Sequence, residues 1–123
     1  MLRTKKKSVK AEIREMVKRI VKQFHPEKII LFGSHARGDA GPDSDVDLLV
    51  VMKLQGQKRE KRIEIGAALS DFDEPLDIIV STPEEVEARK GIAGTIERPA
   101  LQEGKVLYER HRRRRDRDSV PMG

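Results

Sequence analysis

The sequence contains no cysteine and no tryptophan among its 123 residues. Without cysteine, the chain cannot form disulfides, thiolate nucleophiles, iron–sulfur clusters or the usual structural zinc sites. No apolar run approaches the roughly 18–20 residues that span a bilayer. The basic N-terminus is not followed by the apolar core of a signal peptide. We therefore expect a soluble, cytoplasmic protein that has no membrane partner.

Aromatic residues are scarce, with three phenylalanines and one tyrosine. The net charge of +5 comes from the two ends of the chain. Residues 1–10 carry five basic and no acidic residues, and residues 109–123 carry six arginines and three acids. Residues 11–108 hold 15 basic and 18 acidic residues, so this part is mildly acidic. Because so few aromatic side chains are available to stack on bases, we do not expect nucleic acid to be the main partner.

The length suits one domain, and a chain of this size buries roughly two-thirds of its unfolded surface. We expect a basic arm at residues 1–7, one folded domain at residues 8–108 and an Arg-rich tail at residues 109–123. The tail has no hydrophobic periodicity, which predicts disorder unless a partner orders it. The sequence leaves open whether these basic ends bind RNA or are merely solvated.

Hydrophobic periodicity predicts alternating helices and strands within the folded part. A helix begins after the N-cap Ser8 and ends at His25-Pro26, because proline cannot continue it. A second capping signal, at Thr82, begins a helix that ends near Gly91. Further helices are expected at residues 57–70 and 95–103, a helical turn at 34–37, and strands at 28–32, 46–52, 76–80 and 105–108. These elements predict a small α+β domain with a mixed sheet of three to four strands and helices packed mainly on one face.

Two of the predicted strands carry an aspartate inside an otherwise apolar run, Asp47 in VDLLVV and Asp77 in LDIIV. Asp45 and Asp47 are two residues apart, so their side chains leave the same face of a strand. Asp77 joins them if its strand lies beside theirs. Converging buried carboxylates repel one another unless a cation lies between them, and Mg²⁺ suits such hard oxygen ligands. Two such ions about 3.5–4 Å apart could clamp the attacking and leaving oxygens of a phosphoryl-type displacement.

A Gly-rich loop at residues 33–45, GSHARGDAGPDSD, precedes the first pair of aspartates. The backbone N–H groups after Gly33 would face an anion, Ser34 adds a hydroxyl donor, and Arg37 offers a bidentate phosphate contact. There is no Walker-type loop. Each fragment alone is common in structural turns, whereas the combination indicates a nucleoside triphosphate site. We expect His35, within this loop, to be an incidental exposed residue.

The stretch G33-S-H-A-R-G-D-A-G-P-D-S-D-V-D-L-L-V50 closely resembles the signature of the minimal nucleotidyltransferases of the DNA polymerase beta-like superfamily. The resemblance covers about residues 10–108, including the closing phrase EGKVLYE. It implies that Gly33 and Ser34 hold the triphosphate and that Asp45 and Asp47 bind two Mg²⁺ ions. Asp77 matches the third carboxylate, which ligates metal and helps to activate the acceptor hydroxyl. Arg37 and Gly38 match the family's A-R-G phrase.

The resemblance further implies that the protein transfers AMP from ATP to a tyrosine of a HEPN-domain toxin and acts as its antitoxin. An ordered part of about one hundred residues would be filled by the catalytic core, so we expect a second macromolecule or a second copy of the chain to help hold the acceptor. The alternative is a non-catalytic, nucleotide-binding antitoxin that masks its partner by contact. The sequence does not identify the acceptor, the preferred nucleotide or the oligomeric state.

Overall fold

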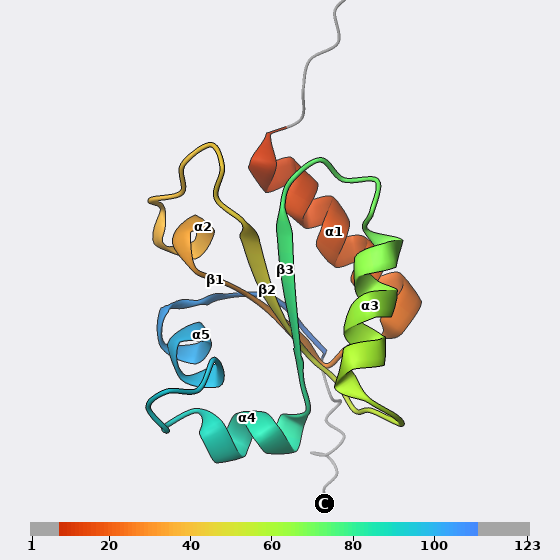
Figure 1. The fold of residues 1–123 in the computed structure, drawn as a ribbon, viewed down its shortest axis with the longest axis vertical. Coiled ribbons are helices and arrows are strands. Elements are labelled where there is room, and N and C mark those ends of the chain that lie inside the picture. Colours follow the sequence, from red (N-terminus) through yellow and green to blue (C-terminus); the bar gives the residue numbers. More distant parts are fainter. Residues whose placement is uncertain (1–7, 111–123) are drawn as a thin grey trace, which may run out of the picture.

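The computed structural model describes residues 8–110 of the chain, so the predictions for the arm at 1–7 and for the tail from residue 111 onward lie outside the described residues. Along this part the elements follow the order that is drawn in Figure 1. They are α1 (Val9–Phe24), β1 (Lys28–Phe32), α2 (Ser34–Arg37), β2 (Val46–Val51), α3 (Lys58–Ala68), β3 (Leu76–Ser81), α4 (Pro83–Arg89), α5 (Glu97–Glu103) and β4 (Lys105–Glu109).

The four strands form one mixed sheet in the order β3-β2-β1-β4. β1 pairs antiparallel with both β2 and β4, whereas β2 and β3 run parallel. The predicted mixed α+β fold is confirmed. The parallel pairing also places the strand of Asp77 directly beside that of Asp47, with the two residues in register. β3 and β4 are the two edge strands.

Helices cover both faces of this sheet, because the central strands β1 and β2 are apolar on both sides. The larger core joins α1 and α3 to one face, through residues such as Ile20, Ile65 and Leu48. A smaller core on the other face joins Val86 of α4 and Ala100 of α5 to alternate residues of β1 and β2. In Figure 1, α1 and α3 lie on one side of the sheet and α4 and α5 on the other. The two longest helices thus share one face, and the short ones cover part of the second.

The predicted capping signals are present in the structure. The Ser8 side chain accepts a hydrogen bond from the Ala11 N–H, and Thr82 and Glu85 form a complete capping box. α3 is shorter than predicted by one residue at its start and two at its end, since Gln57 is extended and Leu69 leaves the helical conformation. No helix among residues 8–110 combines the length and apolarity that crossing a membrane requires.

The folded part ends later than the sequence predicts. Glu109 is the last residue of β4 and pairs with Lys28, and the Arg110 N–H donates to the Glu27 carbonyl at 2.8 Å. The first two residues of the predicted disordered tail therefore belong to the domain, because the edge of β1 offers them backbone partners.

Candidate active site

The three predicted metal-binding aspartates gather where β2 and β3 begin. Asp47 lies opposite Asp77 in the parallel ladder, and Asp45 comes immediately before β2. Side chains alternate along a strand, so Asp47 and Asp77 project to the same face as Leu49 and Val51, the face of α4 and α5. Figure 1 shows α4 and α5 toward the opposite end of the strands. At the end with the aspartates, Asp77 is exposed to solvent and Asp47 is partly exposed.

From the sequence, Asp47 and Asp77 were expected to be buried within strands, and this is wrong for Asp77. Asp47 is half-buried, while Asp45 and Asp77 are exposed. The reason is their position, since Asp77 lies on an edge strand and Asp45 lies in the loop. Burial raises the pKa of the Asp47 carboxyl, the charges of Asp77 and Asp45 raise it further, and His35 and Arg37 partly oppose this. The site therefore concentrates negative charge around Asp47.

Carboxylate oxygens are the donors that Mg²⁺ prefers, and mutual repulsion around Asp47 is what a bound cation would relieve. Within residues 8–110, no three His, Asp or Glu side chains already form a closed metal-binding group. The donor set thus fits a hard divalent ion, and the carboxylates would have to draw together around it.

Gly33 connects β1 to the loop and lies against Asp47. Its φ of 76° and ψ of −156° fall in a region that is essentially restricted to glycine. A Cβ on Gly33 would also overlap the Asp47 Oδ2 atom. Glycine is therefore required here for both conformation and space, and the predicted phosphate loop is in direct contact with a predicted metal ligand.

The remaining loop residues form the short helix α2. The N–H groups of Ala36 and Arg37 bond to the Gly33 carbonyl, and those of Gly38 and Asp39 bond to the Ser34 carbonyl. Gly38 has a φ of 90° and ends the helix in the left-handed conformation, with open space around its Cα. Gly38 therefore serves as the C-cap of α2.

Arg37, the predicted phosphate contact, is half-exposed and forms ion pairs with Asp39 at 3.3 Å and with Glu103 at 3.5 Å. These contacts tie α2 to α5. Arg37 nevertheless lies near enough to Asp47 to lower the pKa of that carboxyl. The structure thus gathers the Gly33 loop, Arg37 and the three aspartates at one end of the sheet.

His35, which was predicted from the sequence to be an incidental exposed residue, is not exposed. It is half-buried, and its Nε2 lies 3.3 Å from the Ser44 carbonyl, so it joins α2 to the segment just before Asp45. The charge of His35 also acts to lower the pKa of Asp47. No sequence pattern indicated that His35 would be half-buried, because its contact with Ser44 forms only when the loop folds back on itself.

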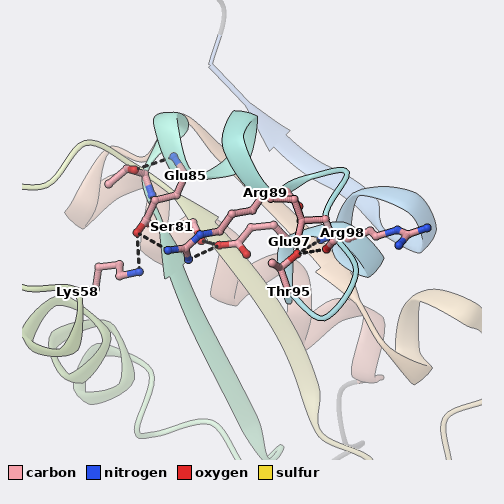
Figure 2. Close-up of polar contacts among 9 residues, drawn as sticks. Lys58, Ser81, Glu85, Arg89, Thr95, Glu97 and Arg98 are labelled. Carbon is pink, nitrogen blue, oxygen red and sulfur yellow. Dashed lines mark hydrogen bonds and ion pairs between the residues drawn. The ribbon is translucent and has the colours of Figure 1, made fainter.

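A buried polar network on the same face of the sheet was also missed. The Ser81 hydroxyl donates to Glu97 Oε2 at 2.6 Å, and both residues are almost fully buried, at 1% and 2% exposure. Figure 2 shows how Arg89 lies between Glu97 and Glu85, at 3.7 and 3.8 Å, and how Lys58 reaches Glu85 at 2.8 Å. The network joins the end of β3 to α3, α4 and α5, and it supports the strand that carries Asp77.

Similarity to known proteins identifies the family of this chain. The family model of the nucleotidyltransferase domain matches residues 10–103. The chain belongs to the nucleotidyltransferase domain family. A candidate protein adenylyltransferase of Methanocaldococcus jannaschii is 37% identical over 76 residues, which cover 57% of this chain and 76% of the relative. The resemblance that was drawn from residues 33–50 is confirmed.

Solved structures share the fold. A crystal structure of a candidate nucleotidyltransferase from Sulfolobus solfataricus matches with a TM-score of 0.56 and 21% identity, covering 89% of this chain and 94% of that one. A chain in the complex of a tri-AMPylated Shewanella oneidensis HEPN toxin with an MNT antitoxin matches with a TM-score of 0.50 and 16% identity, covering 82% and 72%. At these identities the similarity establishes the fold alone.

Proposed function

We propose that this nucleotidyltransferase transfers AMP from ATP to a tyrosine hydroxyl of a HEPN-domain toxin and thereby acts as the antitoxin of that partner. The observation that carries the proposal is the row formed by Gly33, Asp47 and Asp77 at the ends of three neighbouring strands. A phosphate-binding turn and two carboxylates in that order suit the transfer of a nucleotidyl group.

The nucleotide would lie on the β1 side of this row. Gly33 and Ser34 bring backbone N–H groups and a hydroxyl to the triphosphate, and the absence of a side chain at Gly33 lets a phosphate approach the backbone closely. Arg37 exchanges its ion pairs with Asp39 and Glu103 for a phosphate oxygen. Both pairs are exposed to solvent and contribute little, so the exchange is not costly. Gly38 fixes the end of α2.

Asp45, Asp47 and Asp77 would hold Mg²⁺, the ion that their hard oxygens and crowded charges fit. When bound, Mg²⁺ supplies charge stabilisation to the phosphates and to the attacking and leaving oxygens. Asp77 accepts a hydrogen bond from the acceptor hydroxyl and helps to remove its proton. A bond then forms between the tyrosine oxygen and the α-phosphorus, the bond from that phosphorus to the bridging oxygen breaks, and pyrophosphate leaves.

Two similarities support a protein acceptor. The Methanocaldococcus jannaschii relative is a candidate protein adenylyltransferase. The Shewanella oneidensis complex pairs an MNT antitoxin with a HEPN toxin that carries AMP. We extend both properties to this chain because it belongs to the nucleotidyltransferase domain family and carries the Gly-Ser turn and the three aspartates.

The test is an incubation of the purified protein with labelled ATP, Mg²⁺ and the purified product of the neighbouring gene, which the proposal requires to be a HEPN-domain protein. Label is expected on a tyrosine of the partner with the wild-type protein and is expected to be absent with Asp45→Ala/Asp47→Ala. No label with the wild-type protein, or equal label with the variant, would contradict the proposal. Toxin neutralisation that survives alanine at all three aspartates would instead favour the antitoxin that acts by contact.

A further inference from the structure

A groove of about 630 Å³ lies between α1 and β4 and reaches α2 at one end. Its apolar floor includes Ile13 and Val17 of α1, Leu31 of β1 and Leu107 of β4. These residues belong to the face of the sheet that α1 covers. Asp47 and Asp77 project to the other face, that of α4 and α5, so an occupant of the groove does not lie on the carboxylates.

The side of this face that lies over β4 is poorly covered. In the part of the chain that the structure describes, Tyr108 is the one residue of β4 that packs against the larger core. Leu107 remains 37% exposed, although it is a large apolar side chain beside other apolar residues. An apolar surface of this kind, rimmed by polar residues, is typical of a site where a partner binds.

A bulge in β4 directs Leu107 into the groove. Ile29 pairs with Tyr108, and the next residue of β1, Ile30, pairs with Val106. Leu107 is therefore an extra residue in the ladder, and such bulges re-aim side chains. Both Leu107 and Tyr108 thus lie on the α1 face, one lining the groove and the other packed against the core.

The rim of the groove is basic. Lys10, Arg14 and Lys18 recur at every fourth residue of α1 and form one row along the helix, which we call the basic stripe, and Lys105 of β4 also lines the groove. No acidic side chain is present among the described residues of the lining. Within residues 8–110, none of these four cations forms an ion pair. Four positive charges are thus free to meet a ligand.

Charge complementarity calls for an acidic occupant from a different chain. Residues 1–7 carry four basic and no acidic residues, and residues 111–123 carry five arginines and two aspartates, so like charge disfavours both ends of this chain. A second copy carries the same net charge of +5. Nucleic acid would satisfy the charge, but the described lining offers no phenylalanine or tyrosine on which bases could stack. An acidic protein segment with an apolar face satisfies both the floor and the rim.

A helix fits the groove better than an extended segment. β4 is an edge strand, and the bulge at Leu107 and the charge of Lys105 are devices by which proteins prevent pairing along such an edge. The basic stripe, by contrast, has the spacing of a helix, so carboxylates four residues apart on a helix beside α1 would match it. The span from Val9 to Lys18 measures about 15 Å, or about three turns of a partner helix.

We propose that the groove between α1 and β4 docks an acidic amphipathic helix of another protein, packed alongside α1. The apolar face of that helix covers Leu107, and its carboxylates pair with the basic stripe and Lys105. The inference concerns binding alone, so it goes beyond the proposed function and does not require AMP transfer.

The test titrates the full-length chain into a fluorescently labelled peptide of about 18 residues, which is long enough to form a helix. The peptide carries leucines along one face and glutamates along both flanks, and a control peptide has lysine in place of each glutamate. Anisotropy is measured without ATP or Mg²⁺. We expect the acidic peptide to bind and the lysine peptide not to bind. The affinity should fall as salt rises, because the basic stripe is exposed.

Two pairs of variants locate the binding surface. Leu107→Glu should weaken binding of the acidic peptide by roughly tenfold or more, because it places a charge on the apolar floor. Val106→Glu is the matched control and should leave binding unchanged, since Val106 is 53% exposed but pairs with Ile30 on the other face. Arg14→Gln should weaken binding and reduce its salt dependence. Lys22→Gln, at an exposed position of α1 outside the lining, should do neither.

The remaining outcomes would overturn the proposal. These are the absence of saturable binding of the acidic peptide to the wild type, and equal binding by Leu107→Glu and the wild type. Self-association of the wild type in sedimentation that Leu107→Glu abolishes would assign the groove to a second copy of the chain. A single-stranded RNA that binds more tightly than the peptide, and depends on Arg14 but not on Leu107, would assign the basic stripe to nucleic acid.

Discussion

The Asp47 carboxylate lies against Gly33 at the position where any other residue would carry its Cβ. The contact joins the end of β1 to the start of β2, since Phe32 and Asp47 are opposite each other in the antiparallel ladder. A phosphate-binding turn and a metal-binding carboxylate in such contact can act on one nucleotide. Because the two groups are in contact, a side chain added at Gly33 would also displace the Asp47 carboxylate.

Gly33→Ala is the most direct test of this contact. The added methyl overlaps Asp47 and forces alanine into a region that glycine alone adopts readily, at a cost of roughly 1–3 kcal/mol. We expect a lower Tm together with loss of AMP transfer. Gly94→Ala is the control, because Gly94 also has a positive φ but has open space around it, so it should lower the Tm and leave transfer intact. Equal AMP transfer by Gly33→Ala and wild type would show that the contact between Gly33 and Asp47 is not needed for activity.

Replacing the half-buried carboxylate should stabilise the metal-free protein while ending its activity. Burial, and then Asp77 and Asp45, raise the pKa of Asp47, so its ionised form destabilises the folded state. The penalty is absent at low pH and develops as pH rises through the folded-state pKa. In EDTA, Asp47→Asn should therefore raise the Tm by about 2–6 °C at neutral pH and flatten its decline with pH.

In the presence of Mg²⁺, transfer by Asp47→Asn should fall by roughly 100-fold or more. If Asp47→Asn is instead less stable than wild type in EDTA at neutral pH, the ionised Asp47 carboxylate does not destabilise the folded state.

The buried Ser81–Glu97 hydrogen bond should contribute strongly to stability. Ser81→Ala leaves a buried carboxylate oxygen without its 2.6 Å donor, which costs roughly 1–3 kcal/mol. Urea unfolding measures the loss. The double variant Ser81→Ala/Glu97→Met removes both polar partners and should recover part of it. If Ser81→Ala unfolds at the same urea concentration as wild type, the network does not support β3.

The Lys58–Glu85 pair should stabilise the fold only while Glu85 is ionised. The Lys58 side chain, and then the Thr82 backbone, lower the pKa of Glu85. The contribution is therefore full above the ordinary glutamate pKa and is lost as pH falls through the lowered value. Lys58→Met should cost about 0.2–1 kcal/mol at pH 7, because both side chains are partly exposed.

Thermal unfolding of wild type and Lys58→Met across acidic pH checks this, and the two curves should converge as Glu85 protonates. A difference between them that is independent of pH would assign the loss to packing of the lysine stem instead of to its charge.

Most elements were predictable because their signals are local. Ser8, the Thr82 capping box and the apolar runs of the strands act over three to six residues, and the structure places those helices and strands within a few residues of the prediction. Alternation along β2 likewise fixes the face to which Asp47 projects, whereas Asp45 lies in the loop before that strand.

Contacts between distant segments were not predictable from spacing. The pairing of Asp47 with Asp77 depends on β3 docking parallel to β2, and the half-buried position of His35 depends on the loop folding back onto Ser44. The exposure of Asp77 follows from its place on an edge strand. No sequence pattern indicated that Arg37 would pair with Glu103 or that Ser81 would bond to Glu97.

The sequence by itself therefore determined the elements, the family and the identity of the chemical groups, because capping, alternation and a Gly-Ser turn followed by Asp-x-Asp are properties of neighbouring residues. The tertiary structure alone decided that Asp47 contacts Gly33 and that Asp77 stands next to Asp47. These relations depend on which strand packs beside which, and that choice is made by burial of two apolar sheet faces over the whole domain.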